Sequence, residues 1–224
     1  MTTGSPRPQF DRQRTNRDRV RAYHDRTKHH FERYAASLGY LDWENQPNPF
    51  RSFLGAERIP LDHPKLRAQP TYDALFAPRV DPAPLDRTFV SRLFYLSFAL
   101  SAWKQVGDSN PWSLRVNPSS GALHPTEAYL VCGPVAGLTD EPSVFHYAPS
   151  HHALERRRTL PATAWNQLTS SLPPETLLLG LSSIYWRESW KYGERAFRYC
   201  NHDVGHAIGA AAFAARSLGW QVRM

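Results

Sequence analysis

The order of the predicted helices and strands is the feature that most constrains the fold. Periodic apolar residues predict helices over about 18–38, 86–106, 162–172 and 190–218. Short apolar or alternating runs predict strands over 128–132, 144–147, 153–156 and 176–186, the middle two forming a hairpin around a Pro-Ser-His-His turn. Because these elements do not alternate in regular β-α-β order, the sequence predicts an α+β fold.

The chain is expected to have three parts. Residues 1–17 predict a basic, disordered arm, and residues 18–84 predict a helix followed by a proline-rich segment. Aromatic side chains are interspersed among its prolines, which indicates an ordered wrap because disordered tracts are poor in aromatics. Residues 85–224 form the main domain. Its last four residues, Gln221–Met224, look like the start of a further strand, so we expect this domain to be incomplete at its C-terminus.

Charge and apolar content narrow the function classes. The net charge is +7, and residues 1–33 hold nine Lys/Arg against four Asp/Glu, an excess of five positive charges. Such an arm can bind a polyanion, or it can be a solvated leader; because acids alternate with the bases, we do not expect nucleic acid to be the partner. No apolar run is long enough to span a membrane, and Met1–Pro8 lacks the apolar stretch of a signal peptide.

The two cysteines also bear on location. Cys132 and Cys200 fall in elements predicted to be buried, and a lone distant pair is no disulfide framework. We therefore expect a reduced, cytoplasmic protein.

The first group of residues suited to chemistry is the loop Arg115–Gly121. Gly121 and the two preceding serines allow a tight turn whose N–H groups can face a ligand, and Arg115 supplies a cationic fork. The loop lacks the glycine spacing of a P-loop or a dinucleotide-binding turn. It suits a phosphate or the polar edge of a flavin ring, although on the residues alone such a Pro-Ser-Ser-Gly sequence is more often a plain turn.

The second group spans residues 186–199. Lys191, Arg195 and Arg198 recur at helical spacing and predict a basic ridge near a helix N-terminus, where an anion can bind. Lys191, beside Tyr192, can transfer protons if burial lowers the pKa of its ammonium group. The alternative is structural, with Glu188 and Glu194 forming ion pairs with these cations.

The third group is Cys200–His206. His202 and His206 are one helical turn apart and could share a zinc ion, with Asp203 standing where zinc proteases carry a glutamate. No third ligand follows in the sequence. The alternative is that both histidines serve only helix packing.

Three regions of the sequence resemble one family, the N-terminal region in two stretches. Residues 115–129, Arg-x-x-Pro-Ser-Ser-Gly-Ala-Leu-His-Pro-Thr-Glu-Ala-Tyr, resemble the flavin-binding loop of the nitroreductase superfamily, in the version found in SagB/ThcOx-type dehydrogenases. Residues 191–206 resemble the Lys-Tyr region of the same group. Residues 23–28 and 41–47 resemble the N-terminal portion of its longer bacterial members, so that the resemblance covers most of the chain after residue 20.

The resemblance implies a nitroreductase-like fold, with a mostly antiparallel central sheet flanked by helices, that binds FMN non-covalently, commonly as a homodimer. It implies that Lys191 and Tyr192 help to remove a proton while hydride passes to the flavin of an FMN-dependent oxidoreductase. The expected substrate is a small molecule or a peptide-borne heterocycle. The residues expected to bind the cofactor are Arg115, Pro118, Ser119, Ser120, Gly121 and His124, with Arg195 as a further contact to the phosphate or to a ring oxygen.

The sequence departs from the family in two ways. Arg26-Thr27-Lys28-His29 is only a loose substitute for the family's arginine-rich phosphate-binding start, and the second half found in longer relatives does not follow Met224. A missing half-domain or a partner is therefore expected to complete the site. The alternative function is a cofactor-free binding or assembly module that keeps the fold without catalysis.

Overall fold

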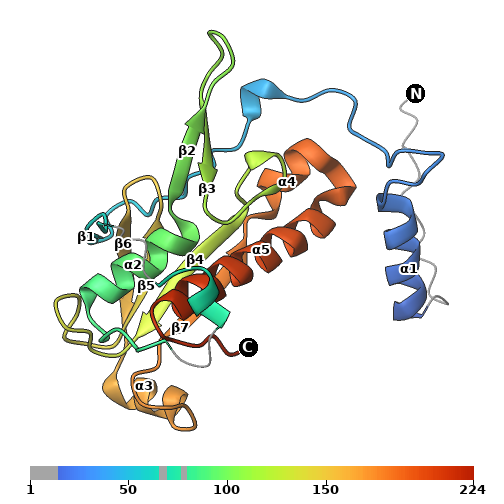
Figure 1. Ribbon diagram of the computed structural model, residues 1–224. Coiled ribbons are helices and arrows are strands. Elements are labelled where there is room, and N and C mark those ends of the chain that lie inside the picture. Colours follow the sequence, from blue (N-terminus) through green and yellow to red (C-terminus); the bar gives the residue numbers. More distant parts are fainter. Residues whose placement is uncertain (1–14, 66–69, 77–79) are drawn as a thin grey trace. The chain divides into compact units, whose positions relative to one another are not determined.

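A computed structural model of the chain describes residues 15–65, 70–76 and 80–224 (Figure 1). It divides into two units, Met1–Gly39 and Tyr40–Met224. Most of the expected basic arm, residues 1–14, lies outside the described residues, as do residues 66–69 and 77–79 of the expected wrap.

In the described part of the first unit, residues 15–39, the chain forms one helix, α1 (Asn16–Thr27). Thr15 caps its N-terminus, since the Asp18 N–H donates to the Thr15 hydroxyl oxygen at 3.2 Å. The prediction that this helix continues to Leu38 was wrong. The backbone turns extended at Lys28, and Phe31 and Tyr34, which suggested a continuing apolar stripe, are exposed.

The second unit is built on a five-stranded antiparallel sheet. In space its strands lie in the order β1 (Arg58–Pro60), β6 (Ala153–Thr159), β5 (Ser143–Ala148), β4 (Thr126–Cys132) and β7 (Leu178–Ser183). The predicted strand at 128–132 and the predicted hairpin at 144–156 are confirmed. The α+β fold class is thereby confirmed, with β1 supplied by the proline-rich segment.

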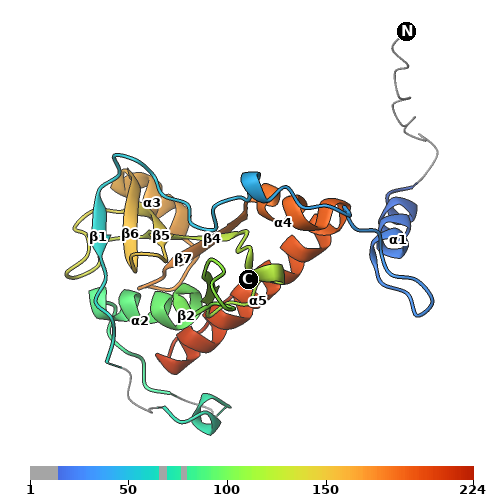
Figure 2. The ribbon, with the colours of Figure 1, turned by 90° about the horizontal axis from the view of Figure 1, so that it is seen from above.

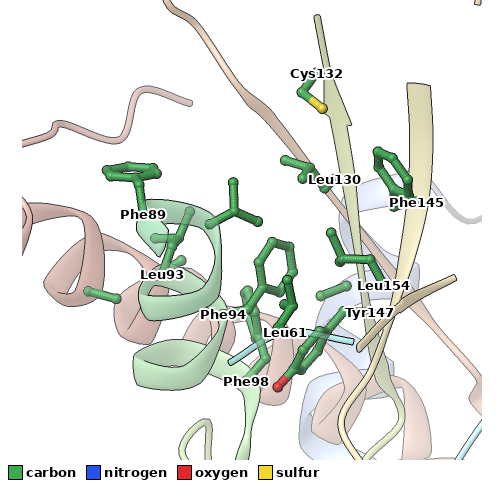
Figure 3. Close-up of a cluster of buried hydrophobic side chains, with 14 of the residues drawn as sticks. Leu61, Phe89, Leu93, Phe94, Phe98, Leu130, Cys132, Phe145, Tyr147 and Leu154 are labelled. Atoms are coloured by element: carbon green, nitrogen blue, oxygen red, sulfur yellow. The ribbon is translucent and has the colours of Figure 1, made fainter. Parts of the chain in front are cut away.

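Two helices, α2 (Arg87–Phe98) and α5 (Ala196–Ser217), pack on each other and on one face of this sheet (Figures 1 and 2). α2 begins at Asp86 as predicted, where the carboxylate accepts from the Phe89 N–H at 2.7 Å. The α5 side chains in the hydrophobic core are alanines (Ala207, Ala211, Ala214 and Ala215), which lets the helix approach closely. The core side chains labelled in Figure 3 include Phe89, Leu93, Phe94 and Phe98 of α2 and Leu130, Phe145, Tyr147 and Leu154 of the sheet.

The prediction of one helix over 86–106 was wrong after Phe98. Residues Leu100–Lys104 form β2, which pairs with β3 (Trp112–Arg115) across the turn at Gly107. Cross-strand pairing therefore wins over the helical period, and Trp103, expected in the core, is 57% exposed.

The C-terminal third also differs from the prediction. The strand predicted over 176–186 ends at Ser183, and the helix predicted over 190–218 is two helices, α4 (Tyr185–Tyr192) and α5. Gly193 separates the two helices, because its backbone has φ +53° and a residue with positive φ cannot continue a right-handed helix. The helix α3 (Ala162–Thr169) is confirmed, three residues shorter than predicted, whereas Gln221–Met224 form no strand.

A network of charged side chains, most of them buried, crosses the sheet. His146 on β5 lies between two carboxylates, with Nε2 2.7 Å from Glu127 on β4 and Nδ1 3.0 Å from Glu155 on β6. Arg187 of α4 pairs with Glu127, and Arg58 pairs with Glu155 at 3.0 Å. When both carboxylates are ionised, each ring nitrogen of His146 donates a hydrogen bond to one of them.

The charges in this network shift the pKa values of its two carboxyl groups in the same direction. Burial by itself would raise the pKa of Glu127 and of Glu155, but the hydrogen bond from His146 and the neighbouring arginines hold both pKa values below the ordinary one. Their contribution to stability is therefore present at neutral pH and is lost as the pH falls through those lowered values.

Replacing His146 by Gln should destabilise the fold strongly. The variant leaves two buried carboxylates without their shared cation, and breaking a buried pair costs about 3–5 kcal/mol. Urea unfolding at pH 7 measures this loss, with His151→Gln as control because His151 is exposed. A loss of unfolding free energy below about 1 kcal/mol, or an equal loss in the control, would show that the buried charge network does not stabilise the sheet.

Candidate functional site

The loop Arg115–Gly121 and the corner between α4 and α5 meet at Gly121. A side chain built at Gly121 would place its Cβ 2.6 Å from the Tyr192 hydroxyl and 3.0 Å from Lys191 Nζ. Gly121 itself is exposed and has φ +64°. The structure thus brings together the loop and the Lys-Tyr pair, which are 70 residues apart in the sequence.

Hydrogen bonds inside the chain fix the loop. The Ser119 hydroxyl oxygen accepts from the His124 N–H at 2.8 Å, across a short 3-10 turn at Ser120–Ala122. Both donors of Ser120, its N–H and its hydroxyl, bond the Asp203 carboxylate on α5, at 3.1 Å and 3.2 Å to Oδ1. The exposed residues of the loop are therefore Val116, Pro118 and Gly121, while Ser119 and Ser120 are half-buried.

Arg115 and His124 lie behind the loop and not on its exposed side. The Arg115 guanidinium donates to the carbonyls of Thr126 and Pro49, at 3.2 Å and 2.7 Å, and burial lowers its pKa to about 10. The His124 ring bonds the Ser113 carbonyl at 3.0 Å. Burial, together with the charge of Arg115, lowers the pKa of His124 to about 4, so its ring is neutral at pH 7.

The corner presents an aromatic and cationic surface. The Tyr192 ring lies 4.4 Å from that of Tyr199, and the Arg195 guanidinium carbon lies 5.4 Å from the Tyr192 ring centre. Lys191 Nζ lies 5.7 Å from the same ring. Burial, and then the negative charge of Glu188, raise the pKa of Tyr192 to about 12, so its hydroxyl is a donor at neutral pH.

The predicted basic ridge is not one continuous helix. Lys191 is in the last turn of α4, whereas Arg198 is in the first turn of α5, and the break at Gly193 separates them. Arg195 stands at the start of α5 and donates to the Tyr199 hydroxyl at 3.3 Å.

Arg187 sets the position of α4, and sequence reasoning missed it. Its guanidinium donates to the His124 carbonyl at 2.6 Å, to the Asn48 carbonyl at 2.9 Å and to Glu127. Only 3% of it is exposed, so it is a buried cation that joins the loop, the wrap and the sheet. The only sequence signal was its place next to a short apolar strand.

Two buried acids were also missed as site residues. Glu188 and Asp203 are 0% and 1% exposed, and the two carboxyl groups lie side by side. Ion pairing of Glu188 with nearby cations was one of the two alternatives left open, and neither of its oxygens has a hydrogen-bond donor among the described residues. An acid between small apolar residues of a buried helix was the available signal for Asp203.

The zinc alternative receives no further ligand. His202 and His206 are both exposed on α5. The residues that the structure describes contain no cluster of three His, Cys, Asp or Glu side chains that could hold a metal ion. None of the described helices is both long and apolar enough to cross a membrane.

A cavity of about 840 Å³ lies away from this corner. Its walls are largely apolar and come from β7, α2, α5 and residues 219–224, and they include none of the predicted site residues. We place the site at the corner because titratable and cationic groups converge there and the cavity walls offer little to bind a polar group.

No protein-family model matches the chain, but two curated relatives do. A protein of Methanocaldococcus jannaschii named as a candidate nitroreductase is 32% identical over 108 residues, which cover 46% of this chain and 52% of the relative. The trifolitoxin-processing protein of Rhizobium leguminosarum bv. trifolii is 33% identical over 111 residues, covering 46% of this chain and 29% of that protein. The match therefore spans about half of one relative and less than a third of the other.

A crystal structure of a candidate nitroreductase from Anabaena variabilis has the same fold. It superposes with a TM-score of 0.65 and 27% identity over 88% of this chain and 38% of that one. The chain has the nitroreductase-like α+β fold predicted from the sequence, and its relatives support a place in that oxidoreductase superfamily.

Comparing Gly121→Ala with Gly107→Ala separates the cost of backbone strain from the effect of a Cβ that meets Tyr192 and Lys191. Both glycines have positive φ, so both variants should lose about 1 kcal/mol of stability. Nothing lies within 4 Å of a Cβ at Gly107, whereas the Cβ at Gly121 displaces Tyr192 and Lys191.

Ultraviolet titration of the tyrosines and urea unfolding measure the two effects. The Gly121 variant should lower the raised pKa of Tyr192 by opening it to water, and the Gly107 variant should not. Unchanged tyrosine titration in Gly121→Ala would mean that the loop and the corner do not meet as described.

Proposed function

We propose that this chain is the FMN-binding part of an oxidoreductase, with its site at Gly121, Lys191 and Tyr192. The single observation that carries the proposal is the convergence of the glycine turn on the Lys-Tyr pair. The similarity to proteins named as nitroreductases agrees with it.

The residues at the corner fit such a cofactor. Gly121 leaves space that a side chain would fill, beside a cationic amine and a neutral phenol. Asn117, in the same loop, is 1% exposed, and its Oδ1 has no hydrogen-bond partner among the described residues. Pro118, Gly121 and Arg195 would hold FMN beside the reacting pair Lys191 and Tyr192, with Ser119 and Ser120 shaping the loop and Arg115 and His124 supporting it from behind.

The chain's own residues have separate tasks in the proposed reaction. FMN, when bound, supplies hydride acceptance and donation. Lys191 carries a proton at Nζ, while the Tyr192 hydroxyl donates a hydrogen bond beside it. Gly121 allows a ring to approach both groups. The buried Arg187 keeps α4 in place, so that these positions do not drift.

The proposed substrate is a small molecule or a peptide-borne heterocycle, as for a SagB/ThcOx-type dehydrogenase. One relative is named as a trifolitoxin-processing protein, which supports a role in processing another molecule. We further propose a homodimer, or a further half-domain, as the partner that completes the site. The two free cysteines agree with a cytoplasmic location.

A cofactor-free binding module is the competing function. The observation that favours it is that the donors of Ser120 and the guanidinium of Arg115 are used inside the chain. Titration of the purified chain with FMN, followed by flavin fluorescence and the visible spectrum, decides between the two. Saturable binding supports the oxidoreductase, and no binding at any FMN concentration supports the module.

Replacing Lys191 by Ala should separate binding from chemistry. The flavin spectrum and the FMN affinity should change by no more than about threefold, whereas reduction of the bound flavin by a peptidyl thiazoline should slow by about 100-fold or more, the usual contribution of a proton-transferring side chain. Stopped-flow absorbance measures the reduction rate.

Lys104→Ala is the matched control, since Lys104 is an exposed lysine of the β2–β3 hairpin. Equal rates in the Lys191 variant and the control would remove Lys191 from the reaction.

A further inference from the structure

Glu188 and Asp203 form a pair of buried carboxyl groups directly beneath the proposed site. Glu188 is on α4, one helical turn before Lys191 and Tyr192, and Asp203 is on α5. Both are almost fully buried, and the Glu188 carboxyl is within hydrogen-bonding reach of Asp203. Among the described residues no donor reaches either oxygen of Glu188.

Two adjacent carboxylates in a buried place cannot both stay ionised at modest cost. Their mutual repulsion and their loss of hydration both favour a single shared proton. Burial first, and then the charge of Asp203, raise the pKa of Glu188 to about 8, although the positive charge of Lys191 acts in the opposite direction. With a proton on Glu188, its hydroxyl donates to Asp203, and the unpartnered carboxyl is satisfied.

Asp203 passes this arrangement on to the loop. Its carboxylate accepts from both the N–H and the hydroxyl of Ser120, the residue before Gly121. The position of Asp203 therefore determines how close Gly121 of the loop lies to Tyr192 and Lys191.

We propose that Glu188 and Asp203 share one proton, and that this proton fixes the loop Ser119–Gly121 against Lys191 and Tyr192. Glu188 is thereby a positioning residue that acts through Asp203 and Ser120. Loss of the shared proton leaves two repelling carboxylates, which move apart and release the loop. The consequence for FMN rests on the proposed function, whereas the effect on the loop does not.

Other groups around the pair do not replace it in this role. From α4, Lys191 and Tyr192 face Glu188, and from α5 Cys200 does so. Burial, and then Glu188, raise the pKa of Cys200 to about 11, and the pKa of Tyr192 is about 12. Both therefore lose their protons above the pH range in which the pair loses its own.

Hydrogen exchange of the peptide covering residues 115–123 tests the proposal without flavin. In the native chain, protection of this peptide, corrected for intrinsic rates, should fall by about tenfold or more between pH 7 and pH 9.5, the factor that one unit of pKa represents. In Glu188→Gln the amide donates to Asp203 at every pH, so protection should change by less than about twofold over that range.

Two further variants complete the design. Asp203→Asn also leaves one acid in the pair and should be equally insensitive to pH, which keeps the test open if Glu188→Gln does not fold. Glu141→Gln removes an exposed carboxylate and should behave as the native chain does. A native loop that stays protected at pH 9.5, or a pH dependence that persists in both pair variants, overturns the proposal.

FMN affinity over the same pH range is the second measurement. The dissociation constant of the native chain should rise by about tenfold toward pH 9.5, while that of Glu188→Gln stays constant within about twofold. A chain that binds no FMN at any pH defeats the proposed function only, because the exchange experiment contains no flavin. A constant affinity in the native chain, with flavin bound, overturns the link between the pair and the site.

Discussion

Arg187 is the contact on which the arrangement of the site depends. It is a buried cation of α4 that donates to the His124 and Asn48 carbonyls and pairs with Glu127. Glu127 is the first acid of the charge network that continues through His146 to Glu155 and Arg58. The helix that carries Lys191 and Tyr192 is thus fastened to the loop, to the proline-rich segment and to three strands at once. An uncompensated charge at Arg187, Glu127 or Glu155, which are buried, would be costly, so the geometry has few alternatives.

The site itself is built on the side of α4 and α5 that faces the loop. Hydrogen bonds of Ser119 and Asp203 hold the turn that contains Gly121. Gly121 is exposed and has no side chain, and its backbone lies against the ends of the Tyr192 and Lys191 side chains. Arg115 and His124 act from behind, one as a buried cation and the other as a neutral ring. Polar groups in such a place serve mainly to hold geometry, and the open face is left for a ligand.

Much of the fold could be predicted from the sequence, and the reasons for the failures are physical. Strand β4 and the β5–β6 hairpin follow from local alternation and turn residues, and Asp86 caps α2 as expected. The helix predicted through Leu100 and Trp103 failed because a partner strand 12 residues away competes for the same backbone, which periodicity does not reveal. The pairing of Glu188 with Asp203 could not be predicted, because the two acids are 15 residues apart in the sequence and only the fold brings them together.

The meeting of Gly121 with Lys191 and Tyr192 is the centre of this account, and a crystal structure of the chain grown with FMN tests it most directly. We expect density for the flavin ring against Gly121, with Lys191 and Tyr192 on its edge and Arg115 and His124 behind the loop. Flavin density in the apolar cavity between β7 and α5, or a corner without flavin in crystals grown from saturated FMN, would contradict it.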